Sequence, residues 1–229
     1  MKRSVIVGAV ALVAVLIGVL GWRSATGGTG RDDTDSRARP AAGSVTAEPG
    51  YRLVGRGRSV VEVPDGWKTN RTKCGTPLAD TVVFHSEVVE DCLLMPLDNY
   101  SVVEIASYGV SFPPEDTKSS DGFYRKELLS KGDDARILVS STDKAIFDRV
   151  VASYRRLPAG WTTVPDLFIG FSGGTPGVDA VPGEPEWTNR LERFGLKLEI
   201  SRGDGRPTAE PAAGIPVRRG STVTVTTRD

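Results

Sequence analysis

The first 22 residues constrain the chain most, because they contain an uninterrupted apolar run. Residues Val5–Trp22 include no charged side chain, and Lys2 and Arg3 precede them. An α-helix of this length covers about 27 Å, close to the hydrocarbon thickness of a bilayer. We therefore predict a membrane anchor over residues 1–22, with a cytoplasmic N-terminus and residues 23–229 outside the cytoplasm. A cleaved signal peptide followed by secretion is the alternative.

A polar segment separates this run from the rest of the chain. Residues 23–50 contain no Leu, Ile or aromatic side chain, and Gly, Ser, Thr, Pro and charged residues fill most of them. Such a composition cannot bury enough apolar area to offset the entropy lost on folding, so we predict a flexible linker. Hydrophobic patterning begins at Tyr51 and is broken by Pro-Ala-Gly at 158–160. We place one domain over 51–160 and a second over 161–229.

The segment 51–160 predicts an α+β domain. Short strand-like runs occur at Val60–Val63 and Thr81–Phe84, and a Pro-Asp-Gly turn precedes Trp67, which we assign to the core. The clearest helical pattern in the chain follows at Thr142–Leu157, where apolar side chains recur every three to four residues. Strands followed by a terminal helix indicate the α+β class. No known family is recognised in this segment.

The chain has two cysteines, Cys74 and Cys92. No His or Cys partner stands at the spacing of a metal site. In an oxidising compartment such a pair predicts one structural disulfide, which would contribute about 3 kcal/mol through loop closure. Two buried thiols are the alternative.

The C-terminal segment carries the most specific motif in the chain. It opens with Val-Pro-Asp-Leu, continues through a helix-like stretch ending in Gly-Leu, and closes with Pro-x-x-Gly-x-x-Val-x-x-Gly-Ser-x-Val-x-Val. The matching positions are Val164, Pro165, Asp166, Leu167, Gly195, Leu196, Pro211, Gly214, Val217, Gly220, Ser221, Val223 and Val225. In order and spacing they resemble the PASTA family, small repeats found in bacterial penicillin-binding proteins and Ser/Thr kinase ectodomains. The resemblance implies one helix on a three-stranded sheet.

The departures from this family limit what the resemblance implies about ligands. A Gly- and Pro-rich insertion delays the helix after Leu167, and the chain has one copy where kinase ectodomains carry several. The resemblance implies exposure to the cell wall more directly than it implies binding of peptidoglycan fragments. The matching residues are therefore predicted to be structural, and no ligand-binding residue is assigned.

The charge balance and the absence of catalytic motifs argue against nucleic-acid binding and against several classes of enzyme. Lys plus Arg and Asp plus Glu balance at 29 each, so no general basic field attracts nucleic acid. His85 is the only histidine, and no nucleophile-elbow or zinc motif surrounds it. Of the carboxylate pairs Glu90–Asp91 and Asp133–Asp134, the second follows a Lys-Gly and is interpreted as a solvated turn. Trp187 is assigned to the core. The sequence predicts no catalytic residue, metal or cofactor.

These observations predict a non-enzymatic protein of the bacterial cell envelope that binds or scaffolds through its PASTA-like domain. Its partner would be peptidoglycan fragments or an envelope protein, and residues 1–22 would contact the membrane. One alternative is a regulatory subunit that recognises an envelope protein through 51–160. Another is an unrecognised hydrolase in that segment, which would require a cleft joining His85 to a serine or a carboxylate.

Overall fold

Short β-strands dominate the described part of the chain. The computed structural model describes residues 45–73, 76–84, 99–107, 121–168, 183–204 and 207–227. These ranges contain fifteen strands, two α-helices and one short 3-10 helix. The predicted α+β class is therefore wrong, because the chain is mostly β. The helix predicted over Thr142–Leu157 is reduced to α1, Lys144–Ala152, since Arg155 and Arg156 pair with a strand instead.

Two further predictions concern the anchor and the disulfide. Among the helices of the described ranges, none has the length and apolarity needed to cross a membrane. The predicted anchor, residues 1–22, lies outside those ranges. No disulfide occurs within them either, and Cys74 and Cys92 both lie outside. The described part is thus a β-rich fold that includes neither the membrane helix nor the disulfide predicted from the sequence.

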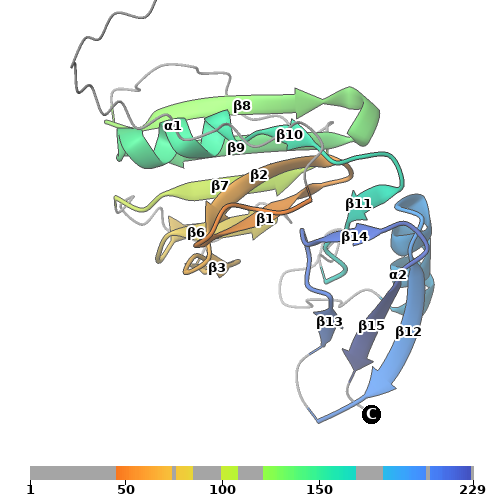
Figure 1. Ribbon diagram of the computed structural model, residues 1–229. Coiled ribbons are helices and arrows are strands. Elements are labelled where there is room, and N and C mark those ends of the chain that lie inside the picture. Colours follow the sequence, from red (N-terminus) through yellow and green to blue (C-terminus); the bar gives the residue numbers. More distant parts are fainter. Residues whose placement is uncertain are drawn as a thin grey trace, which may run out of the picture. The chain divides into compact units, whose positions relative to one another are not determined.

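The two largest sheets built from the residues that precede position 160 have five and three strands (Figure 1). The larger sheet has the order β3-β6-β7-β9-β8, with bounds Lys68–Thr69, Thr81–Phe84, Val102–Ala106, Ala135–Ser141 and Tyr124–Ser130. β3, β6 and β7 pair in parallel, whereas β9 is antiparallel to both its neighbours. The smaller sheet contains the hairpin β1 (Tyr51–Arg56) and β2 (Ser59–Pro64), with β10 (Arg155–Arg156) beside β2. Three short elements complete the list: β4 (Thr72–Lys73), β5 (Thr76–Pro77) and the 3-10 helix η1 (Lys131–Asp133).

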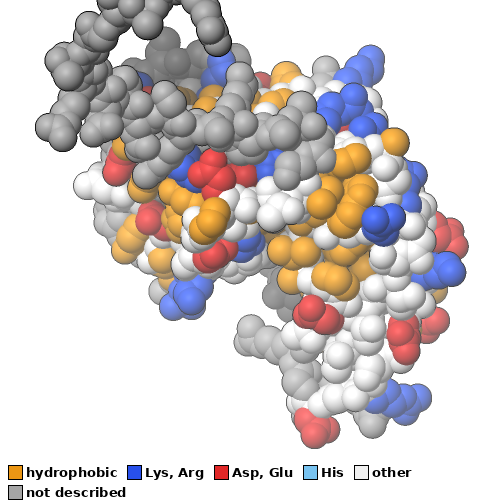
Figure 2. All heavy atoms as spheres, in the orientation of Figure 1, with side chains coloured by type: hydrophobic (Ala, Val, Ile, Leu, Met, Phe, Trp, Pro, Cys, Tyr) orange, Lys and Arg blue, Asp and Glu red, His pale blue; other side chains and the backbone are white. Residues whose placement is uncertain are grey.

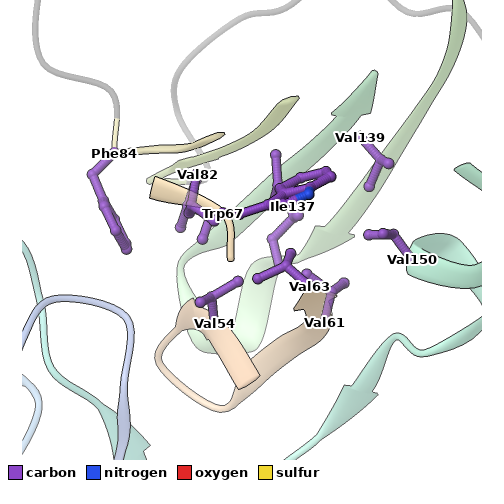
Figure 3. Packing of buried hydrophobic residues seen from close by; sticks show 11 residues of the cluster. Val54, Val61, Val63, Trp67, Val82, Phe84, Ile137, Val139 and Val150 are labelled. Carbon is purple, nitrogen blue, oxygen red and sulfur yellow. The ribbon is translucent and has the colours of Figure 1, made fainter. Parts of the chain in front are cut away.

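One apolar core joins these sheets to α1 (Figure 3). Its buried members are Val54, Val61, Val63, Trp67, Val82, Phe84, Val103, Ile105, Ile137, Val139 and Val150. β-branched side chains predominate because they pack well on a pleated surface. The prediction that Trp67 is a core residue is confirmed, since only 7% of it is exposed.

The C-terminal segment forms a helix on a small sheet. β11 (Trp161–Thr163) pairs with β14 (Pro216–Arg218), and α2 spans Glu184–Arg193. The three-stranded sheet has the order β12-β15-β13, with bounds Lys197–Arg202, Thr222–Thr227 and Thr208–Glu210. β12 is parallel to β15, and β13 is antiparallel to it. The core of this segment comprises Val164, Leu167, Trp187, Leu191, Leu196, Val217, Val223 and Val225.

Backbone hydrogen bonds join the two segments. Contacts place Ala38–Asp229 in one compact unit. The Thr163 N–H donates to the Gly57 carbonyl at 2.8 Å, and the Gly55 N–H donates to the Gly214 carbonyl at 3.2 Å. Segments 51–160 and 161–229 therefore meet at an interface inside that unit.

Part of the segment predicted as a linker is also packed. Val45 and Ala47 lie against a small cluster formed by Leu53, Val60 and Leu157. Two isolated apolar residues in a polar stretch give little compositional signal, so the sequence did not indicate this contact.

Candidate binding groove between α2 and β12

An open groove of about 400 Å³ lies between α2 and β12. Its lining residues are Glu184, Thr188 and Glu192 on α2, together with Leu196, Lys197, Leu198 and Ile200 at and along β12. A spacing of four residues keeps the three α2 side chains on one face of the helix. In Figure 1, α2 and β12 lie side by side. The groove therefore has one wall from a helix face and one from a strand.

The neighbouring stripe of α2, which carries Trp187 and Leu191, holds the helix in place. Trp187 and Leu191 are buried in the C-terminal core, and the Trp187 ring packs edge-on to Phe168 with centroids 6.1 Å apart. The prediction that Trp187 is a core residue is confirmed. Because this stripe is fixed by packing, the face carrying Glu184 and Glu192 is presented in a defined direction.

Gly195 turns the chain from α2 into β12. Its φ of +70° is a conformation that glycine adopts without strain, as expected for a residue just after a helix. The strand then runs back along the helix that precedes it. β12 has six residues and occupies one edge of its sheet, whereas β13 at the opposite edge has three. The longer edge is the one that faces the groove.

The residues that line the groove carry a net charge of −1, from Glu184, Glu192 and Lys197. Glu184 and Glu192 are both exposed, and neither carboxylate makes an ion pair or a hydrogen bond with another described residue. Lys197 supplies the one ammonium of the lining. Ile200, 39% exposed, adds an apolar surface at the strand edge.

These groups suit binding. Aliphatic side chains, carboxylates, a hydroxyl and a strand edge offer burial, charge and hydrogen bonds to one ligand. The Thr188 hydroxyl donates to the Glu184 carbonyl at 2.9 Å, within its own helix. Within the described ranges, no three His, Cys, Asp or Glu residues come together in a way that could hold a metal ion.

The PASTA-motif residues mostly lie in the core and turns of the C-terminal segment. Val164, Leu167, Leu196, Val217, Val223 and Val225 are core residues, and Gly195, Gly214 and Gly220 have positive φ values. Pro211 follows a cis peptide bond, Pro165 is buried, and Ser221 accepts the Lys197 N–H through its carbonyl. Only Leu196 of the motif lines the groove.

Asp166 lies at the interface with the preceding segment. Burial raises the pKa of its carboxyl, although hydrogen bonds from the Phe168 N–H and the Asn70 side chain act in the opposite direction. The Phe168 N–H lies 2.9 Å from the Asp166 carboxylate. This motif residue therefore connects the two segments instead of facing a ligand.

The carboxylates considered for catalysis have structural roles or lie outside the described ranges. His85 and Glu90–Asp91 lie outside. The solvated-turn interpretation is wrong for Asp133, whose side chain is 4% exposed and accepts hydrogen bonds from Arg156, Ser130 and Ser59. Asp134 remains exposed and pairs with Arg56 at 2.9 Å.

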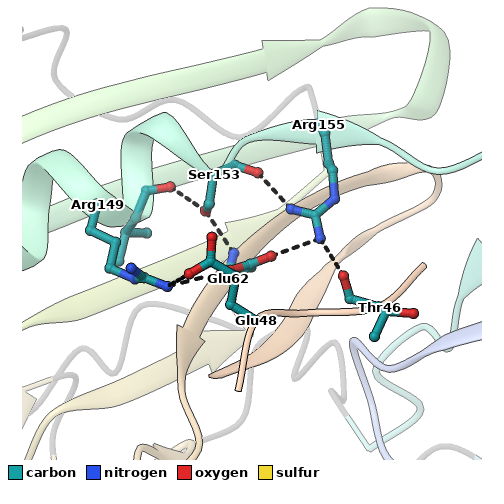
Figure 4. Close-up of polar contacts among 7 residues, drawn as sticks. Thr46, Glu48, Glu62, Arg149, Ser153 and Arg155 are labelled. Atoms are coloured by element: carbon teal, nitrogen blue, oxygen red, sulfur yellow. Dashed lines mark hydrogen bonds and ion pairs between the residues drawn. The ribbon is translucent and has the colours of Figure 1, made fainter. Parts of the chain in front are cut away.

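A buried ionic cluster holds residues 46–48 on the fold (Figure 4). Arg155 donates to Glu62 at 2.8 Å and to the Thr46 carbonyl at 3.0 Å. Arg149 donates to Glu48 at 2.6 Å. Glu62 is 1% exposed, so its charge requires these partners. The charged side chains of the cluster pair with one another within the protein, and we assign the cluster to stability.

Apolar side chains gather where β11 and β14 lie, whereas the surface over β12, β13 and β15 is mostly polar (Figure 2). Trp161 and Pro216 are half-buried there, and the Arg218 guanidinium lies 5.3 Å from the centre of the Trp161 ring. Since Arg218 already covers the Trp161 ring, the groove is the stronger candidate.

Comparison with protein families, curated proteins and solved structures finds no match. The PASTA resemblance therefore stays a prediction, and the groove is the feature of the described residues that indicates a function.

Sequence reasoning missed the groove, although part of its signal was present. Glu184, Thr188 and Glu192 recur every four residues on the polar side of a helix whose apolar side was recognised. The position of β12 at a sheet edge depends on long-range pairing with β15, which local patterns do not reveal.

Proposed function

We propose that the protein is a non-enzymatic binding protein of the cell envelope, and that the groove between α2 and β12 holds its partner. The observation that carries the proposal is that two carboxylates with no partner among the described residues lie beside an exposed aliphatic residue, along a strand edge that no described strand covers. The neighbouring stripe of α2, with Trp187 and Leu191, is packed in the core, which favours a preformed site.

The partner is proposed to be a protein. A polypeptide supplies the three kinds of group that the lining complements, namely ammonium groups, aliphatic side chains and backbone amides. Peptidoglycan fragments are the other class implied by the PASTA resemblance, and the test below separates the two.

Site-specific photo-crosslinking tests the proposal. A photoreactive amino acid is placed at Ile200 in the full-length chain, expressed in its host. Glu199 is the matched control, because it is exposed on the same strand but on the other face of the sheet. We expect an adduct from Ile200 and much less from Glu199.

The digestion of the adduct identifies the partner class. An adduct that survives muramidase and is degraded by protease supports a protein partner. Loss of the adduct on muramidase treatment would assign the groove to peptidoglycan instead. Equal labelling from both positions, or none from Ile200, would remove the basis for a binding role of the groove.

A further inference from the structure

We propose that β12 takes up an extended polypeptide segment as an additional strand, and that two basic residues four positions apart in this segment pair with Glu184 and Glu192. The inference rests on the proposed function, because it specifies the ligand of the same groove. Its evidence is the backbone, the apolar side chains and the charges along β12 and α2.

Among the described residues, the backbone of β12 pairs with β15 on one side and with no strand on the other. The Lys197 N–H donates to the Ser221 carbonyl at 2.9 Å, and the Gly203 N–H donates to the Thr227 carbonyl at 2.9 Å. In a parallel pair, alternate residues direct their amide and carbonyl groups to the same neighbour. Leu198 and Ile200 therefore direct theirs away from β15, to the side where a further strand would pair.

The apolar side chains mark which face the added strand would cover. Leu198 lies opposite Val223 and Ile200 opposite Val225, and both valines are buried in the core. All four side chains therefore point to the same face of the sheet as α2. Ile200 is one of two large hydrophobic residues of the described ranges that are exposed, the other being Leu129. Cross-strand contact with an incoming side chain would bury it.

The spacing of the carboxylates defines the charge pattern of the ligand. Glu184 and Glu192 are eight residues apart on α2, which corresponds to about 12 Å along the helix axis. Residues four positions apart in an extended strand are about 13 Å apart and point to the same side. A segment with basic residues at positions k and k+4 therefore matches both carboxylates, whereas a spacing of two spans only about 7 Å.

The ends of β12 limit where pairing can extend. Lys197 and Arg202 stand at its two ends, and charged side chains at a strand edge discourage unspecific pairing. Between them, the outward amide and carbonyl groups of Leu198 and Ile200 remain for the ligand, so its paired stretch is no longer than the six residues of β12. A second copy of this chain is a competing occupant that the experiment must exclude.

The probe is a fluorescein-labelled peptide, Thr-Lys-Thr-Val-Thr-Lys-Thr, whose lysines and central valine share one face; it is titrated with the purified full-length chain and followed by fluorescence anisotropy. We expect saturable binding that weakens at least tenfold when both lysines are replaced by glutamate. A tenfold loss is also expected when alternate backbone amides of the peptide are N-methylated, because strand pairing then becomes impossible. Shifting the lysines to a spacing of two should weaken binding several-fold.

Protein variants complete the test. The double change Glu184→Lys and Glu192→Lys should weaken binding at least tenfold, whereas Glu199→Lys, which alters charge on the other face of the same strand, should leave it within twofold. On binding, hydrogen exchange of the Leu198 and Ile200 amides should slow.

Three results would overturn the proposal: equal binding of the N-methylated peptide, an equal loss of affinity with Glu199→Lys, or concentration-dependent dimers formed through β12. If Ile200 crosslinks to a protein while these peptides fail to bind, strand addition is wrong and the binding function stands; absence of both removes both.

Discussion

Gly214 is a residue at which the two segments approach closely. Its φ is +79°, and a Cβ atom placed on it would lie 2.5 Å from Cζ of Phe84, a residue of the first core. Gly214→Ala therefore adds a left-handed backbone cost and a steric overlap. We expect the free energy of unfolding to fall by about 2–4 kcal/mol, measured by urea denaturation.

Gly220→Ala is the control for this substitution. Gly220 also has a positive φ, +88°, but a Cβ atom on it would meet no atom within 4 Å. Gly220→Ala should therefore lower the free energy of unfolding only by the cost of the left-handed backbone conformation, about 1–2 kcal/mol. Equal losses for the two variants would show that contact with Phe84 contributes nothing.

Single residues differ in how far the sequence predicted them. Val223 and Val225 alternate with threonines, a pattern that indicates one buried face of a strand, and both valines are buried. Glu62 and Asp133 gave no such signal. Their partners Arg155 and Arg156 are distant in sequence, so a buried carboxylate could not be distinguished from a solvated one.

At the scale of elements, Asp133 ties η1 to β2 and β10. Burial acts to raise the pKa of its carboxyl, but hydrogen bonds from Arg156, Ser130 and Ser59 outweigh burial and hold the pKa below its usual value. The stabilisation from a carboxylate with a lowered pKa is complete above the unfolded pKa of about 3.9, and it is lost as pH falls through the folded pKa.

Asp133→Asn should therefore lower the free energy of unfolding by about 1–3 kcal/mol at pH 7, because it weakens charge-assisted hydrogen bonds. The difference from the native chain should shrink as pH falls below about 4, because the carboxyl of the unfolded chain then binds a proton, and it should be lost as pH falls through the lower folded pKa. Urea denaturation from pH 3 to pH 7 measures this difference in the free energy of unfolding.

Asp134→Asn is the matched control. The Asp134 side chain is 59% exposed, so we expect the free energy of unfolding to change by less than about 1 kcal/mol. A difference that is constant across this pH range would contradict the argument.

Elements were predicted best where the pattern was local. The strand at Thr81–Phe84 was predicted with its observed bounds. The helix α1 was also predicted, but the predicted range was longer than the observed helix. The helix ends early because the Ser153 hydroxyl bonds to the Val150 carbonyl at 2.6 Å and accepts the Glu62 N–H at 2.8 Å. That arrangement directs Arg155 and Arg156 into β10, beside a strand more than ninety residues earlier.

The whole molecule was the hardest scale to predict from the sequence. The Pro-Ala-Gly break at 158–160 suggested two domains, and two apolar cores do occur on either side of it. Yet Gly55 and Gly57 of the first segment bond to Gly214 and Thr163 of the second. Backbone groups carry no residue-specific signal, so this interface could not be anticipated.

This interface predicts that residues 51–229 unfold in one cooperative transition. Separating the segments would break the bonds at Gly55 and Gly57 and remove the contact between Gly214 and Phe84, so neither core should persist without the other. Trp67 reports the first core and Trp187 the second. Two full-length variants, each retaining one of these tryptophans with the other three replaced by phenylalanine, should give the same urea midpoint by fluorescence after correction for their own stabilities.

Adding Gly214→Ala to both reporter variants sharpens this test. If the segments are coupled, the substitution should lower the Trp67 and Trp187 midpoints by the same amount, although Gly214 lies in only one of the segments. A shift confined to Trp187, or a second transition at lower urea, would show that 161–229 folds and unfolds independently. The interface would then be a contact between separate domains, and a partner bound in the groove could not stabilise residues 51–160.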